Sequence, residues 1–272
     1  MEVPLRAEMA RAELPTPDPD HAGGGNGLLD RPLLNVTADD CAEALARFRE
    51  RRPHVHCITN AVAQSLTANV LLAAGATPST TIAPEEIADF AGFADALLVN
   101  LGTMDEARRE AAGVAVGVAN AAGKPWVLDP VFVHASRPRL ALARELLTLR
   151  PTLVRANAAE RAALEPNADQ LLAVTGAEDI VEKGTRRVHV TNGTPLMARV
   201  TAMGCALTAL AAGFLAANDD PFVATSAALA FFGLAGERAA AEAGGPGTFE
   251  PLLLDRLASL TPDDLRTEAR LL

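Results

Sequence analysis

The feature that most constrains this chain is an alternation of short apolar runs with longer segments of helical periodicity. The short runs are bounded by turn residues and cover residues 54–58, 96–99, 126–128, 152–154 and 171–174. Runs of this length are typical of buried strands. Strands that alternate with helices predict an α/β fold, in which a largely parallel sheet is covered by helices on both faces.

The helical segments are read from the spacing of their apolar residues. A helix is expected over residues 104–122, with Ala111, Val114, Val118 and Ala122 on its buried face, because they recur at spacings of three and four. Residues 178–192 break the alternation and predict an antiparallel hairpin. Further helical runs cover residues 204–217 and 221–243, and a last one lies around 252–257.

The N-terminal part differs in composition from the rest. Residues 15–26 include Pro-Asp-Pro-Asp and Gly-Gly-Gly-Asn-Gly, which bury too little apolar surface to offset the entropy of ordering them. Residues 1–34 are therefore expected to form a flexible extension. Residues 35–272 are expected to form one domain, whose first helix is capped at Thr37.

Charge and composition exclude several classes of protein. Lys and Arg total 24 and Asp and Glu total 34, and the resulting net charge of −10 argues against a nucleic-acid-binding surface. Apolar residues make up 49% of the 272 residues, which excludes a disordered chain. The three cysteines form no metal-binding pattern, and neither a signal peptide nor a membrane span is visible, so we expect a soluble cytoplasmic protein.

The strongest local signal is a turn that opens onto an apolar helix, Val200-Thr-Ala-Met-Gly-Cys205. The free N–H groups of a helix start, together with Gly204, favour an anion-binding site. The helix start is also expected to lower the pKa of the Cys205 thiol, which would make it a candidate base or nucleophile. The alternative is a buried structural cysteine beside a glycine that packs the helix.

Polar residues also follow the predicted strands, where ligands of parallel sheets bind. Asn157 and Glu160 stand three apart and either orient a hydrated Mg²⁺ or form an N-terminal capping box. Arg155 suits a phosphate group. Asp129 and Thr175 follow two other predicted strands, where Asp129 could lie near a metal or nucleotide phosphates and Thr175 could bind a phosphate oxygen. Each could instead be an ordinary turn residue.

Ten ordered fragments, from about residue 40 to the C-terminus, together resemble the hydroxyethylthiazole kinase family, ribokinase-like enzymes of thiamine salvage. They include His56-Cys-Ile-Thr-Asn60, Leu128-Asp-Pro-Val131, Arg155-Ala-Asn-Ala-Ala-Glu160 and Gly245-Pro-Gly-Thr-Phe249. The resemblance implies a ribokinase-like three-layer α/β sandwich and a homotrimer with active sites at subunit contacts. It also implies that ATP and Mg²⁺ phosphorylate the primary alcohol of 4-methyl-5-(2-hydroxyethyl)thiazole.

The same resemblance implies roles for individual residues. Arg155, Thr175 and Asp129 correspond to the nucleotide side, and Asn157 and Glu160 to the residues that orient the metal. Cys205 corresponds to the residue near the attacking alcohol. The substrate-binding positions are Asn60, Thr80, Ala202 and Gly204.

The sequence departs from the family pattern at several of these positions. Ala202 replaces a glycine, which would cost roughly 1 kcal/mol if its φ is positive. Thr80 replaces a methionine of the substrate wall, and Phe132 opens a turn that is usually rich in glycine. Only 14 residues separate Glu160 from Thr175, where the family usually has a few dozen. The alternatives to a thiazole kinase are therefore a catalytically impaired ribokinase-like binding protein and a kinase of a related small alcohol.

Overall fold

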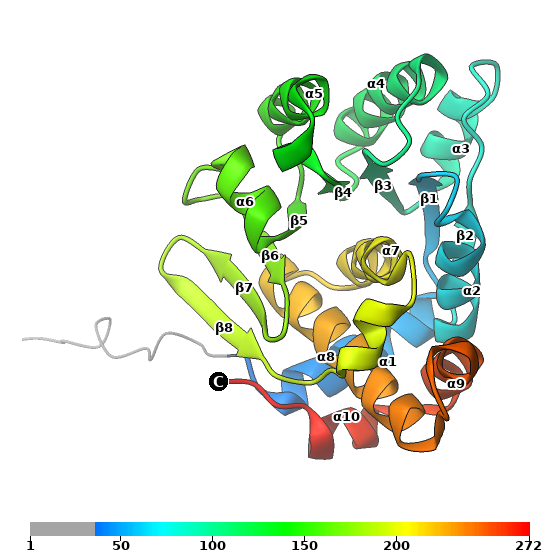
Figure 1. The fold of residues 1–272 in the computed structure, drawn as a ribbon. Coiled ribbons are helices and arrows are strands. Elements are labelled where there is room, and N and C mark those ends of the chain that lie inside the picture. The colour runs from blue at the N-terminus through cyan, green and yellow to red at the C-terminus, as the bar shows by residue number, and fades with distance from the viewer. Residues whose placement is uncertain (1–35) are drawn as a thin grey trace, which may run out of the picture. The chain divides into compact units, whose positions relative to one another are not determined.

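One eight-stranded sheet organises residues 36–272, the part of the chain that the computed structural model describes (Figure 1). The strands lie in the order β2-β1-β3-β4-β5-β6-β7-β8. Neighbouring strands are parallel from β2 to β6, and β7 and β8 are antiparallel to their neighbours. The strands are β1 (His54–Ile58), β2 (Thr77–Ser79), β3 (Ala96–Asn100), β4 (Trp126–Asp129), β5 (Leu153–Asn157), β6 (Leu172–Thr175), β7 (Asp179–Lys183) and β8 (Arg186–Val190).

Helices cover both faces of this sheet, and each face has its own apolar core. One face carries α1 (Ala38–Arg51), α2 (Gln64–Ala74), α7 (Met203–Ala217), α8 (Pro221–Glu242), α9 (Pro246–Ser259) and α10 (Pro262–Glu268). The other face carries α3 (Ile87–Phe93), α4 (Glu106–Ala121), α5 (Arg137–Thr148) and α6 (Ala158–Leu164). Two short 3₁₀ helices, η1 (Val133–Ala135) and η2 (Pro195–Arg199), complete the described elements. The predicted three-layer α/β architecture is confirmed.

The predicted strands agree with the structure in position and direction. All five apolar runs form parallel strands, and the expected hairpin is the antiparallel pair β7 and β8. Several elements were not predicted by residue range, namely α2, α3, α5, α10, η1, η2 and β2. β2 has only three residues, one of them Pro78, and it lies at the edge of the sheet, while α10 has only seven residues.

The predicted buried face of α4 is correct for Ala111 and wrong for Val114 and Ala122. The buried residues of the helix are Ala111, Ala112, Ala115, Val116 and Ala119, whereas Val114 is 41% exposed. Both sets of residues have the spacing of a helix face. In a helix so rich in alanine, hydrophobicity alone did not distinguish the two faces, and contact with the sheet selected the neighbouring one.

The start of the described region agrees with the predicted helix cap. Thr37 and Asp40 form a capping box, in which each side chain accepts a hydrogen bond from the other residue's backbone N–H. The extension predicted for residues 1–34 lies outside the described residues. Within residues 36–272, no helix combines the length and apolar character needed to cross a membrane.

Candidate functional site

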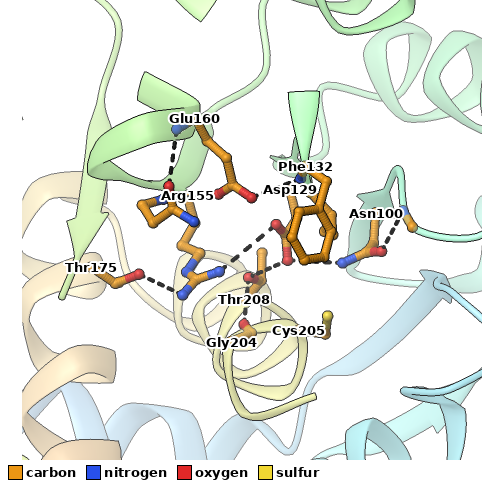
Figure 2. A network of polar contacts seen from close by, with 12 residues as sticks. Asn100, Asp129, Phe132, Arg155, Glu160, Thr175, Gly204, Cys205 and Thr208 are labelled. Carbon is orange, nitrogen blue, oxygen red and sulfur yellow. Dashed lines mark hydrogen bonds and ion pairs between the residues drawn. The ribbon is translucent and has the colours of Figure 1, made fainter. Parts of the chain in front are cut away.

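The carboxyl ends of the central parallel strands bring several of the predicted site residues together (Figure 2). Asp129 ends β4, Asn157 ends β5 and Thr175 ends β6. The first turn of α7, with Gly204 and Cys205, lies opposite these strand ends. The polar residues that follow the predicted strands therefore do lie together in the structure.

Asp129 is the buried centre of the cluster. Its Oδ2 atom accepts hydrogen bonds from Nδ2 of Asn100 at 2.8 Å and from Oγ1 of Thr208 at 2.9 Å. Its Oδ1 atom has no hydrogen-bond partner among the described residues, and the nearest cation is Nη1 of Arg155 at 3.9 Å. Burial raises the pKa of Asp129 to about 6, although the charge of Arg155 opposes this shift. Asp129 thus has one oxygen held in place and one oxygen without a hydrogen-bond partner.

Arg155 connects Asp129 to the strand end of β6. Its guanidinium donates a hydrogen bond to the hydroxyl of Thr175, and only 16% of its side chain is exposed. The guanidinium also lies against Gly204, where a Cβ atom would be 2.5 Å from Nη1. Gly204 is therefore required for Arg155 to occupy this position.

Asn157 and Glu160 form the N-terminal capping box of α6. The side chain of Asn157 accepts from the N–H of Glu160 at 2.9 Å, and Oε2 of Glu160 accepts from the N–H of Asn157 at 2.9 Å. The second oxygen of Glu160 accepts from the backbone N–H of Phe132 at 2.8 Å. Glu160 is buried and ties the start of α6 to the turn after β4. Each of its oxygens keeps a second lone pair, so the cap does not exclude a role beside a hydrated metal.

The pKa of the Cys205 thiol is raised, although the sequence predicted that it would be lowered. Burial, reinforced by the negative charge of Asp129, raises the pKa of the thiol to about 11. Only 9% of the residue is exposed, and Sγ accepts a hydrogen bond from Nδ2 of Asn60 at 3.3 Å. Loss of solvation therefore outweighs the positive end of the helix, and the thiol is neutral near pH 7.

A pocket of about 340 Å³ adjoins the cluster. It is lined by two of the four predicted substrate-binding residues, Asn60 and Ala202, and by the predicted catalytic residue Cys205. A third predicted substrate-binding residue, Gly204, lies beside them in the first turn of α7. Thr80 follows the edge strand β2 and does not line the pocket. The remaining lining residues are Val62, Gly102, Thr103, Val131, Phe132, Arg139 and Thr201.

Three non-glycine residues of the pocket have a left-handed backbone, namely Thr103, Phe132 and Ala202. Ala202 has φ 65° directly before α7, so the position does need the conformation that glycine adopts most easily. Phe132 has φ 58°, and 60% of it is exposed. Ala202 and Phe132 are two positions where the sequence departs from the family pattern, and in both the backbone keeps a shape typical of glycine.

Several residues of the site were given no role from the sequence. Asn100 accepts from Nδ2 of Asn60 at 3.0 Å while it donates to Asp129, so a chain of buried amides joins Cys205 to Asp129. Thr208 stood as a lone polar residue in an apolar helix, one turn after Gly204, which was its only signal. Arg139 carried no signal that distinguished it from other helical arginines.

Comparison with known proteins identifies the family. A model of the hydroxyethylthiazole kinase family matches residues 45–171 and 164–263 of the chain. The chain belongs to that family. A hydroxyethylthiazole kinase from Cereibacter sphaeroides is 46% identical over 259 residues, covering 86% of this chain and 98% of the relative. A probable hydroxyethylthiazole kinase from Agrobacterium fabrum is 45% identical over 235 residues, covering 86% of this chain and 96% of the relative.

Solved structures agree with the ribokinase-like fold. The structure of a hydroxyethylthiazole kinase protein from Pyrococcus horikoshii OT3 matches with a TM-score of 0.82 at 39% identity, over 85% of this chain and 98% of that protein. A ribokinase-like superfamily protein from Enterococcus faecalis matches with a TM-score of 0.62 at 13% identity, over 83% of this chain and 95% of that protein. This second likeness shows the fold alone.

The family comparison also locates the shortened segment. The two matched stretches meet at residues 164–171, between α6 and β6. The Cereibacter and Agrobacterium relatives cover the same 86% of this chain, but the alignment is 259 residues long for the first and 235 for the second. The Agrobacterium relative therefore needs almost no insertion, and a short form of the chain is shared within the hydroxyethylthiazole kinase family.

Proposed function

We propose that this protein transfers the γ-phosphoryl group of ATP to the primary alcohol of 4-methyl-5-(2-hydroxyethyl)thiazole, a reaction of thiamine salvage. Membership of the hydroxyethylthiazole kinase family supports the reaction class. The observation that carries the proposal is that Arg155, Asp129 and the start of α7 converge beside one small pocket. Phosphoryl transfer needs positioned groups that neutralise charge more than it needs covalent chemistry.

The nucleotide side of the site is assigned to Arg155 and Thr175. A guanidinium binds phosphate oxygens through charge-assisted hydrogen bonds, and Thr175 holds Arg155 in place. Nε of Arg155 has no hydrogen-bond partner among residues 36–272. The backbone N–H groups at the start of α7 add the positive end of a helix, which favours negative charge on a transferred phosphoryl group.

The buried carboxylates fit a magnesium ion. Asp129 has an oxygen without a hydrogen-bond partner, and the negative charge of Glu160 contributes to the raised pKa of Asp129, so the two carboxylates repel each other across the space between them. No group of three or more metal-binding side chains occurs in the part of the chain described. Mg²⁺ usually needs only one or two carboxylates, because water and substrate phosphates complete its shell. When bound, Mg²⁺ would neutralise phosphate charge, with Asp129, Asn157 and Glu160 orienting its shell.

The acceptor alcohol is assigned to the pocket. Its volume lies within the range of small-molecule sites, Asn60, Ala202 and Cys205 line it, and Gly204 lies beside them in the first turn of α7. Cys205 contacts the alcohol as a neutral thiol in this proposal, because its raised pKa does not suit a general base near pH 7.

The homotrimer and the cytoplasmic location remain proposals from the family resemblance. Thr80 lies outside the pocket formed by one chain. A second copy that completes the pocket would account for a substrate-side role of Thr80.

Acceptor-dependent release of ADP tests the proposed function. Purified protein is assayed with ATP and Mg²⁺, with and without the thiazole alcohol, beside the Cys205→Ala variant. We expect turnover that requires the alcohol and is reduced in the variant. Binding of the alcohol or the nucleotide without turnover would instead support the impaired binding protein. Turnover with other small alcohols, but not with this one, would support a kinase of a related acceptor.

A further inference from the structure

Arg139 places a positive charge in the pocket. It lies in the first turn of α5, is partly buried, and lines the pocket together with Val131 and Phe132. Its Nη1 atom donates to the backbone oxygen of Val131 at 2.7 Å. Because Val131 directly follows Asp129-Pro130, this hydrogen bond fixes the guanidinium beside the turn that carries the buried carboxylate.

No carboxylate among the described residues lies within ion-pair distance of this charge. Within residues 36–272, Arg139 forms no ion pair, whereas Arg155 faces Asp129 and Arg108 pairs with Asp105. No residue that lines the pocket is a carboxylate. The polar lining residues Asn60, Thr103 and Thr201 are neutral. The pocket therefore combines one guanidinium with neutral walls, in a chain whose net charge is −10.

An unpaired guanidinium is suited to an anion, and above all to a phosphate group. The acceptor alcohol of the proposed reaction is neutral and does not use this charge. The reaction replaces the hydroxyl proton with a phosphoryl group, and a phosphate monoester carries a charge of about −1.5 to −2 near pH 7. The product, unlike the acceptor, therefore matches the charge of the pocket.

We propose that Arg139 binds the phosphate group of the phosphorylated product, so that the pocket holds phosphate monoesters more tightly than the corresponding alcohols. The identity of the ester rests on the proposed function. The anion contact itself rests on the charge and neighbours of Arg139. A consequence is inhibition by product that competes with the alcohol.

Calorimetric titration of the full chain without ATP tests this contact directly. The two ligands are the thiazole alcohol and its phosphate monoester, and inorganic phosphate serves as a third probe. Arg139→Gln removes the charge but keeps a side-chain N–H donor for the oxygen of Val131. We expect Arg139→Gln to weaken ester binding by at least about tenfold and alcohol binding by less than about twofold, because hydrogen bonds to charged groups are the stronger ones.

Two further variants separate charge from structure. Arg139→Lys keeps the charge and should retain part of the preference for the ester. Arg137→Gln removes a charge from the same helix at an exposed position outside the pocket lining, and it should change neither affinity. Equal losses for ester and alcohol in Arg139→Gln, or no loss for the ester, would overturn the proposal.

The binding measurements test the role of Arg139 separately from the proposed kinase activity. Ester binding that depends on Arg139 in a protein without turnover would support the anion contact and count against the proposed kinase. Turnover with ester binding that does not depend on Arg139 would overturn only the assignment of Arg139.

Discussion

The guanidinium of Arg155 lies against Gly204, at the start of α7, so closely that a Cβ atom at residue 204 would be 2.5 Å from Nη1. The same guanidinium donates to Thr175 and faces Asp129 at 3.9 Å. Three elements, β4, β6 and α7, thereby set the position of one arginine. In the proposed kinase, that position determines how ATP is held.

Gly204→Ala should displace Arg155 without unfolding the protein. The clash is with the end of a flexible side chain, and alanine favours a helix by up to about 1 kcal/mol over glycine. We expect a higher KM for ATP and little change in thermal stability. Gly117→Ala is the matched control, because an added methyl group there meets no atom within 4 Å. Unchanged ATP kinetics in Gly204→Ala would contradict the role of this contact.

Ala202→Gly should relieve backbone strain and raise kcat. Ala202 has φ 65°, a conformation that costs a non-glycine residue roughly 1 kcal/mol. Arg52→Gly is the control, because Arg52 has φ 47° at the end of α1, away from the pocket. Both variants should gain up to about 1 kcal/mol in free energy of unfolding in denaturant melts. Unchanged turnover in Ala202→Gly would count against our account of this turn.

The pH profile of kcat/KM should fall on the acid side near the pKa of Asp129, about 6. Protonation removes the carboxylate charge that the proposed metal site requires. The hydrogen bond from Thr208 lowers this pKa, so Thr208→Val should move the acid limb to higher pH. Thr225→Val is the control, since Thr225 is a buried helical threonine whose hydroxyl donates to the oxygen of Pro221. An acid limb that does not respond to Thr208→Val would assign it to another group.

The contribution of Asp129 to folding stability should change with pH in the direction opposite to its contribution to activity. Its folded-state pKa of about 6 lies above the ordinary value of 3.8, so the folded protein binds the proton more tightly than the unfolded chain does. This contribution favours the folded state at low pH and is lost as the pH rises through about 6. Denaturant melts of Asp129→Asn should lack this contribution, whereas a pH dependence identical to that of the parent would refute it.

Glu160→Gln should affect both stability and the requirement for Mg²⁺. One of the two backbone N–H groups that Glu160 binds would face an amide NH₂, which costs about 1 kcal/mol. The loss of charge beside Asp129 should raise the Mg²⁺ concentration needed for half-maximal turnover. Asp40→Asn removes the equivalent carboxylate from the capping box of α1 and should affect stability alone. An unchanged Mg²⁺ requirement in Glu160→Gln would leave Glu160 with only its capping role.

The sequence predicted the central sheet well because its strands are apolar runs enclosed by turn residues, a local signal. Because the carboxyl ends of parallel strands meet at one edge of the sheet, the positions of Asp129, Arg155 and Thr175 at or near strand ends predicted that they lie close together. Contacts distant in sequence were harder to predict. Thr208 reaches Asp129 across 79 positions, and no spacing pattern reveals such a contact.

Burial explains why the predicted direction of the Cys205 pKa shift was wrong. The helix start suggested a lowered pKa for Cys205, but the extent of desolvation depends on how α7 packs against the strand ends. For Ala202, by contrast, the structure agrees with the conformation predicted from the sequence. Its positive φ was expected on condition that the turn keeps its glycine-type shape, and the structure has that shape.

The most direct test of the central claim is phosphorus NMR of a mixture of protein, ATP, Mg²⁺ and 4-methyl-5-(2-hydroxyethyl)thiazole. We expect a phosphate monoester signal to grow in step with ADP, and to grow more slowly with Arg155→Ala because its ATP binding is weakened. Folded protein that forms no ester, or that forms ester at the same rate without Arg155, would contradict the proposed kinase site.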